Sequence, residues 1–218
     1  IAGHGYNLTI ADATVASGAA MTVNGLQLGA GDSLTFDGSA DTTGGTLTLD
    51  GGAGDDMLTG GHGADTIRGG AGTNVLTGGG GADLLIGTGT DTFVYNGVSD
   101  STSLGHDTVR GFDAASDTFK LTGITVNAID AAVTTGMLNA GGMNPANFDL
   151  NLASAIGASQ LHAHDAVLFT PDRGTLAGHT FLIVDANGTA GYQAGQDYVI
   201  DITGATNLGS LSTTNFSS

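Results

Sequence analysis

A nine-residue repeat rich in glycine constrains this chain more than any other feature of its sequence. Four units follow one another in register: GGAGDDMLT from Gly51, GGHGADTIR from Gly60, GGAGTNVLT from Gly69 and GGGGADLLI from Gly78. A fifth unit, GTGTDTFVY from Gly87, is one residue short before its aspartate. A fixed period of this kind predicts a solenoid in which each unit is stable only when stacked on its neighbours.

The glycine positions predict turns that expose backbone oxygens. Glycine lacks a Cβ and adopts conformations that other residues avoid, so the turn can present its carbonyl groups together. An oxygen-bearing side chain follows at position six of each unit. Calcium prefers six to eight oxygen ligands, which carbonyls and carboxylates supply. The predicted calcium ligands in the repeats are Gly52, Gly54, Asp56, Gly61, Gly63, Asp65, Gly70, Gly72, Asn74, Gly79, Gly81, Asp83, Gly89 and Asp91.

The last three residues of each unit predict a short strand whose apolar eighth residue points into the core. These core residues are Leu58, Ile67, Leu76, Leu85 and Phe93. Two units make one coil, so the turns of units one, three and five should lie along one edge and those of units two and four along the other. Each ion would then lie between the turns of units n and n+2. The predicted fold class is all-β, a parallel β-roll flanked by strand-rich capping regions.

Two other interpretations of the glycine-rich block are weaker. A flexible linker would not keep an aspartate and an apolar residue at fixed offsets through five units. A phosphate-binding loop needs a strand before the glycines, a helix after them and a group that holds the anion, and this block has none of these.

The repeat resembles the RTX, or haemolysin-type, calcium-binding repeat, and the residues after it look like the segment that closes the roll in serralysin-type proteins. The similar stretches are 91–95, 99–101 and 106–113. The resemblance implies Asp100 and Asp107 as further calcium ligands. Gly111 stands where that family usually has an aspartate, and capping of turns is an equal alternative role for both aspartates.

Other aspartates outside the repeats are also candidate ligands. Asp37 and Asp41 precede the first full unit and could complete the open end of the roll, with turn capping as an equal alternative. Asp185, Asn187 and Asp197 belong to a loop that resembles a D-x-N loop found near the end of type I secreted proteins. A complete calcium loop would carry another acid at Thr189.

His162 and His164 form an H-x-H pair, which on a strand would place two imidazoles on one face. No third ligand is identifiable from the sequence, so solvated or core histidines are the preferred interpretation. The chain has no glutamate, which excludes an H-E-x-x-H zinc-protease motif within it. We therefore expect no catalytic activity from this chain itself.

Charge and composition restrict the partners. All 21 acidic residues are aspartate, only four residues are lysine or arginine, and the formal net charge is -17. Such a charge disfavours nucleic acid and anionic membranes and favours cations. Cysteine is absent, so a disulfide cannot stabilise the chain. No apolar run is long enough to predict a transmembrane segment.

Composition also predicts the organisation of the chain. We expect a β-rich N-terminal cap over 1–50, the calcium-binding roll over 51–95, a roll-closing segment over 96–126 and a β-rich C-terminal region over 127–218. Short helices or loops are expected within 127–161. The last residues, 208–218, resemble an uncleaved type I secretion tail. The first residue is Ile1 rather than methionine, so we expect a piece of a longer protein.

These features together predict an extracellular module that folds on binding several calcium ions after export by a type I secretion apparatus. The preferred parent is a structural protein of the cell surface, such as an S-layer or biofilm protein, with self-association or a cell-surface polysaccharide as further partners. The alternative is the non-catalytic C-terminal domain of a secreted hydrolase, such as a serralysin-like metalloprotease or a lipase.

Overall fold

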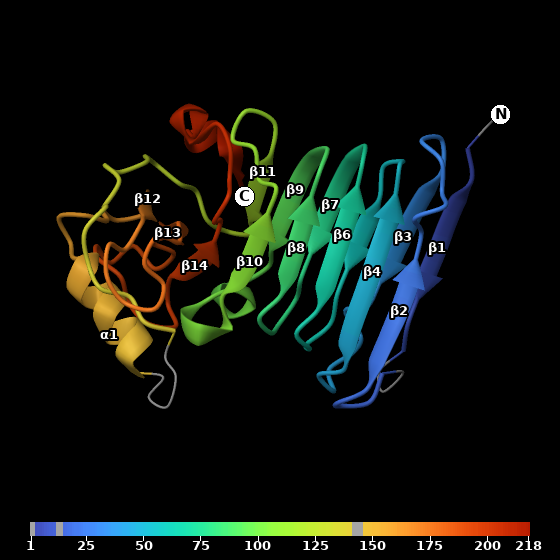
Figure 1. Ribbon diagram of the computed structural model, residues 1–218, viewed down its shortest axis with the longest axis horizontal. Coiled ribbons are helices and arrows are strands. Elements are labelled where there is room, and N and C mark those ends of the chain that lie inside the picture. Colours follow the sequence, from blue (N-terminus) through green and yellow to red (C-terminus); the bar gives the residue numbers. More distant parts are fainter. Residues whose placement is uncertain (1–2, 12–14, 141–145) are drawn as a thin grey trace.

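The computed structural model of the protein describes residues 3–11, 15–140 and 146–218. Two sheets face each other, and consecutive strands alternate between them along most of the chain, as Figure 1 shows. One sheet contains β1 (Gly5–Thr9), β3 (Ser33–Asp37), β5 (Met57–Thr59), β7 (Thr73–Thr77), β9 (Thr90–Tyr95), β11 (Thr118–Leu121) and β15 (Phe216–Ser217), in that spatial order. The other contains β2 (Ala20–Asn24), β4 (Thr46–Gly52), β6 (Thr66–Gly70), β8 (Leu84–Gly87), β10 (Asp107–Arg110), β14 (Tyr198–Asp201), β13 (Phe181–Val184) and β12 (Ala166–Phe169).

The repeat strands pair in parallel with the unit two ahead, as the nine-residue period predicts. Leu58 is paired with Leu76, and Leu76 with Phe93, in one sheet, while Ile67 is paired with Leu85 in the other. All five of these side chains are fully buried. The predicted parallel β-roll is therefore confirmed, and its core is a stack of apolar residues at position eight of each unit.

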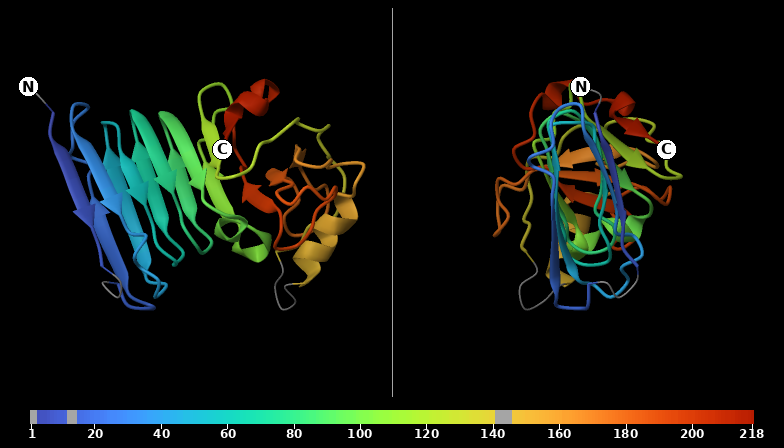
Figure 2. Two further views of the ribbon diagram at one scale, coloured as in Figure 1. Left: turned by 180° about the vertical axis from the view of Figure 1, so that it is seen from behind. Right: turned by 90° about the vertical axis from the view of Figure 1, so that its right-hand side faces the viewer.

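The same two sheets continue upstream of the repeats. β3 pairs with β5 and β4 pairs with β6, so the ladder crosses Gly51 without a break. In the outermost coil, Tyr6 and Leu8 of β1 align with the buried Leu34 and Phe36, yet they expose 45% and 46% of their surfaces. Among the described residues, the core ladder therefore ends at an open face at the N-terminal end of the roll, the end that is turned toward the viewer in the right-hand view of Figure 2.

The C-terminal region closes the other end of the roll. β12, β13 and β14 pair antiparallel, and β14 joins the roll by pairing in parallel with β10. Alternate residues of this hairpin sheet face opposite ways: Leu182 and Ile200 pack into the core of the roll, whereas Ile183 and Val199 pack into a second core. The helix α1 (Ala146–Ala155) supplies Leu152 to that second core.

Residues 127–161, for which short helices or loops are predicted, take two different forms. The helix α1 lies in the second part of this range, whereas residues 128–139 form isolated parallel bridges, such as that of Val133 with Phe169. Short 3-10 helices cover Val98–Asp100, Ser103–Gly105, Leu208–Ser210 and Thr213–Asn215. Among the described residues, no helix is both long and apolar enough to cross a membrane.

Candidate metal centre

The position-six side chains of units one, three and five form a hydrogen-bonded ladder along one edge of the roll, here called the first edge. Asp56 Oδ1 accepts from the N–H of Leu34 at 2.7 Å, and Asp56 N–H donates to Asn74 Oδ1 at 3.0 Å. Asn74 Nδ2 donates to Asp91 Oδ1 at 2.9 Å. Each side chain thus bonds to a coil beside its own, in line with the predicted n to n+2 stacking.

The second edge repeats this arrangement with the turns of units two and four. Asp65 Oδ1 accepts from the N–H of Leu47 at 2.7 Å, and Asp65 N–H donates to Asp83 Oδ1 at 2.7 Å. Asp83 N–H donates to Asp107 Oδ1 at 2.8 Å. Asp107, which the resemblance to the roll-closing segment implied as a ligand, therefore continues the second edge by one coil.

Several of these carboxylates have one bonded oxygen and one bare oxygen. The Oδ2 atoms of Asp41, Asp56, Asp83 and Asp107 are buried, since all four residues are at most 3% exposed, and they have no hydrogen-bond partner among the described residues. Burying a charged carboxylate without a partner costs free energy. The arrangement therefore fits a bound cation that is coordinated by oxygen atoms. The remaining repeat aspartates differ, since Asp65 Oδ2 and Asp91 Oδ2 accept backbone N–H groups of their own turns.

Burial also shifts the acidity of these groups. Desolvation raises the pKa of Asp83 to about 8, with the charge of Asp65 contributing. Desolvation raises the pKa of Asp56, Asp65, Asp91 and Asp107 as well. Burial in the folded chain therefore favours the protonated, uncharged form of these carboxyl groups. A bound cation would lower their pKa values again and favour the charged form.

The predicted glycines lie in the turns that stack along the two edges. Gly70 and Gly79 have φ values of +87° and +95°, which a side chain rarely adopts. A Cβ on Gly70 would overlap the carbonyl oxygen of Gly52, and a Cβ on Gly79 would overlap that of Gly61. The carbonyls of one turn are thus aimed at the next turn. The same turns contain the other predicted glycines, Gly54, Gly63, Gly72, Gly81 and Gly89.

The upstream and closing aspartates divide into two kinds. Asp37 Oδ1 accepts from the N–H and hydroxyl of Ser39, and Asp100 Oδ2 accepts from the N–H groups of Asn96 and Gly97, so both cap local turns. Asp41 also caps a turn through Oδ1, but its Oδ2 is the bare buried atom described above. Of these three, Asp41 alone presents a free buried oxygen to a repeat turn.

The structure brings Asp185 and Asp197 together, but the side-chain amide of Asn187 is directed away from their carboxylates. Asp185 accepts the N–H groups of His164, Asn187 and Gly188, and Asp197 accepts those of Ala186 and Gln193. The Asn187 amide instead faces two glutamine side chains. Every carboxylate oxygen of this loop therefore has a backbone donor, and the prediction that it binds calcium stays a prediction.

His162 and His164 do not face one metal. His162 Nδ1 lies 2.7 Å from Asp130 Oδ1, whereas His164 has a φ of +58° and its N–H donates to Asp185 Oδ2. Another histidine of this region, His179, pairs with Asp201 at 2.9 Å. His162 and His164 lie outside the described strands, so the alternation that would place their side chains on one face does not apply to them.

Asp117 is a member of the first edge that the sequence interpretation missed. Its Oδ1 accepts from the N–H of Asp91 at 3.0 Å, its Oδ2 accepts from the N–H of Asp113 at 2.8 Å, and the residue is 1% exposed. It therefore extends that edge by one coil, as Asp107 extends the second. The available signal was the apolar Phe119 two residues later, which repeats the spacing from Asp91 to Phe93.

Comparison with known families gives a match. The family described as the C-terminal region of peptidase M10 serralysin matches residues 27–168, more than half of the chain. The match begins before β3 and ends within β12, so it includes the repeats and both edges. No curated protein matches the chain.

Proposed function

This chain belongs to the peptidase M10 serralysin C-terminal family, and on that premise we propose that it is an extracellular module whose roll folds when calcium binds. The family makes it a serralysin-type RTX repeat region, which binds calcium and occurs in secreted proteins as a part distinct from the catalytic one. The finer proposal concerns which residues hold the ions and what the binding does.

The observation that carries the proposal is the row of bare, buried carboxylate oxygens along the two edges. We assign Asp41, Asp65, Asp83 and Asp107 to ions on the second edge. Asp56, Asp91 and Asp117 serve the first edge, with carbonyl oxygens of the stacked turns completing each set. Calcium, when bound, supplies positive charge and accepts several oxygens in a flexible geometry.

The chain's own residues explain why folding would wait for the ion. Stacking brings Asp65 beside Asp83 and Asp83 beside Asp107, and like charges at such short range repel, most strongly where water is excluded. The glycine-rich turns have a high conformational entropy when unfolded, which further opposes folding. At a calcium concentration ten times its Kd, each site would add about 1.4 kcal/mol of stability. A few such sites match the net stability of a domain.

Circular dichroism tests this proposal directly. Protein treated with a chelator should lose most of its β-sheet signal, recover it with calcium and recover far less with magnesium. Magnesium needs a small octahedral site and releases water reluctantly, which suits flexible carbonyl turns poorly. A full β-sheet signal in excess EGTA would show that the roll does not need the ion.

For the parent protein, we favour a structural role at the cell surface after export by a type I secretion apparatus. The open end of the roll supports self-association, because β1, among the described strands, pairs on one side only, with β3, and leaves Tyr6 and Leu8 exposed. Sedimentation with and without calcium tests this: assembly that Tyr6→Lys and Leu8→Lys together abolish would support it, and a monomer at all calcium concentrations would oppose it.

The alternative role is the non-catalytic tail of a secreted hydrolase, and the family match to a peptidase C-terminal region favours it. An H-E-x-x-H or G-x-S-x-G motif in any residues that precede Ile1 would decide for this alternative. In both cases the chain by itself should hydrolyse neither peptide, ester nor glycosidic substrates, which standard assays of the calcium-loaded chain would check.

A further inference from the structure

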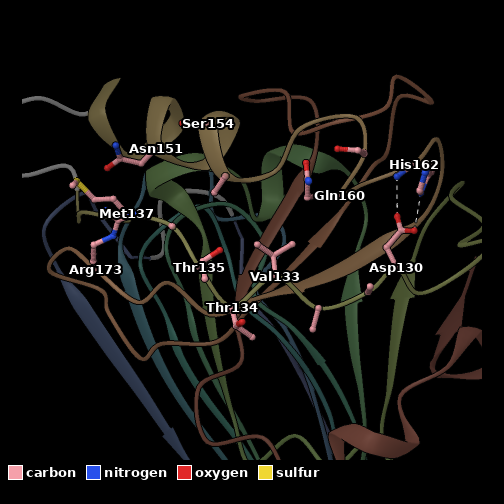
Figure 3. A pocket seen from close by; sticks show the side chains of 15 residues that line it. Asp130, Val133, Thr134, Thr135, Met137, Asn151, Ser154, Gln160, His162 and Arg173 are labelled. Carbon is pink, nitrogen blue, oxygen red and sulfur yellow. Dashed lines mark hydrogen bonds and ion pairs between the residues drawn. The ribbon is translucent and has the colours of Figure 1, made fainter.

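A cluster of one imidazole and two carboxylates lies outside the roll, in the C-terminal region. Asp130 and His162 lie on the wall of a groove of about 730 Å³ that runs between residues 130–137 and α1. Figure 3 shows the two side chains joined at one end of this groove. Asp165 completes the cluster: one ligand atom from each of the three residues lies within 4.8 Å of the other two.

Backbone hydrogen bonds hold the three residues in place. Asp130 N–H donates to the carbonyl of Ala166 at 2.7 Å, and Ala166 N–H donates to that of Ala128 at 3.0 Å. Asp165 N–H closes a turn onto the carbonyl of His162 at 3.1 Å, and His162 N–H donates to Asp130 Oδ2 at 2.8 Å. The cluster is thus formed by two segments that are joined by backbone hydrogen bonds and by the Asp130 side chain.

Asp165 lies beside the His162–Asp130 pair but is not hydrogen-bonded to it, so its position is not explained by an ordinary histidine–aspartate pair. His162 Nδ1 lies 2.7 Å from Asp130 Oδ1 but 3.9 Å from Asp165 Oδ2, too far for a hydrogen bond. Asp165 is 8% exposed, and within the described part of the chain its carboxylate accepts no hydrogen bond. A mostly buried carboxylate beside the pair, without a protein donor, leaves its oxygens available to a cation.

We propose that Asp130, His162 and Asp165 bind a first-row transition cation of the zinc class, with water in the remaining positions. One imidazole nitrogen and two carboxylate oxygens are a donor set that zinc accepts at 2.0 to 2.2 Å, roughly. Such a centre needs the donor atoms about 3.3 Å apart. The separations of His162 Nδ1 from Asp130 Oδ1 and Asp165 Oδ2, 2.7 and 3.9 Å, bracket this value, and the His162 side chain is 60% exposed, which leaves room for it to shift toward Asp165.

The imidazole separates this site from the calcium sites of the roll. Calcium takes oxygen ligands, whereas imidazole suits zinc, copper and nickel. The inference therefore does not rest on the calcium-binding proposal, and the two can fail separately.

Calorimetric titration of the calcium-loaded chain with zinc chloride, with calcium kept in large excess, tests the inference. We expect one zinc ion per chain, and a loss of affinity of tenfold or more in His162→Ala and in Asp165→Asn. The matched control is His179→Ala, which removes another partly exposed histidine paired with one aspartate, Asp201, and should leave zinc binding unchanged.

The calcium dependence of the circular dichroism signal should be the same in His162→Ala as in the unaltered chain, which would show that the fold is intact. Asp165→Asn keeps the shape of the side chain and guards against a variant that does not fold. The inference is overturned if zinc does not bind in excess calcium, or if it binds with the same affinity in His162→Ala and Asp165→Asn.

Discussion

Asn74 occupies the place in its turn that an aspartate occupies in the other four repeats. Its Oδ1 accepts from Asp56 N–H, which directs Nδ2 toward the carbonyl of Gly70 at 3.2 Å and toward Asp91 Oδ1 at 2.9 Å. The amide therefore donates hydrogen bonds where an aspartate would present a second oxygen. The Asn74 amide thus satisfies two oxygens of the first edge, the Gly70 carbonyl oxygen and Asp91 Oδ1, without a cation. The second edge has aspartates at the equivalent positions, so the two edges differ in charge.

We predict that Asp65→Ala raises the calcium concentration for half-folding by a larger factor than Asn74→Ala, and that Asn74→Asp lowers it. Asp65 contributes a formal charge to the second edge, whereas Asn74 contributes none to the first. Asn74→Asp also adds repulsion when calcium is absent, so its calcium-free state should be less compact. Circular dichroism titrations in one buffer give the midpoints, and equal midpoints for the two alanine variants would contradict the assignment.

Asp117 allows a second test at the residue scale. Asp117→Ala removes the acceptor of two N–H groups, of Asp91 and Asp113, in a buried position, and each buried donor left without a partner costs about 1–3 kcal/mol. We expect a clear drop in the thermal midpoint in saturating calcium. Asp55→Ala is the matched control, because Asp55 is exposed and accepts one hydrogen bond, from Thr73 N–H. Equal losses in the two variants would argue against a place for Asp117 in the first edge.

At the scale of elements, each turn depends on a small number of glycines rather than on all of them. Unit four begins with four glycines in a row, and their surroundings differ. Gly79 has a positive φ and touches the carbonyl of the stacked turn, whereas a Cβ on Gly80 would have its nearest neighbour 3.8 Å away, at His62.

We therefore predict that Gly79→Ala destabilises the calcium-loaded roll by at least about 1–2 kcal/mol, through backbone strain and overlap with Gly61. Gly80→Ala should be neutral or slightly stabilising, because alanine restricts the unfolded chain without straining the folded one. Urea unfolding of both variants in saturating calcium measures the difference. A similar loss in both would mean that the turns need flexibility rather than close stacking.

At the scale of the whole molecule, burial of the repeat carboxylates links folding to pH. Their pKa values in the folded, calcium-free chain are raised, that of Asp83 to about 8, so the folded state holds protons that the unfolded state releases. The stability tied to these groups is fully present below their ordinary pKa near 3.8 and is lost as the pH rises toward 8.

We predict that the calcium-free chain has more β-structure at pH 5 than at pH 8, and that adding calcium increases the β-structure less at pH 5, because protons already neutralise the oxygens for which the ion competes. Circular dichroism of calcium-free protein across this range measures the first effect, and calcium titrations at both ends measure the second. A β-sheet signal that grows with pH in the absence of calcium would contradict the assignment of the buried aspartates.

The sequence by itself determined the roll, because a nine-residue period with glycine, aspartate and an apolar residue at fixed offsets leaves one way to stack turns on turns and bury the apolar ladder. It also indicated the two edges, since position six recurs in every unit. It did not reveal Asp117, which lies 26 residues beyond its partner Asp91, outside the repeat spacing. Nor could it show that Asp130 meets His162 and Asp165, or that the oxygens of Asp185 and Asp197 are already bonded. These depend on how irregular segments of the C-terminal region fold back on one another, and local spacing carries no information about contacts made across such distances.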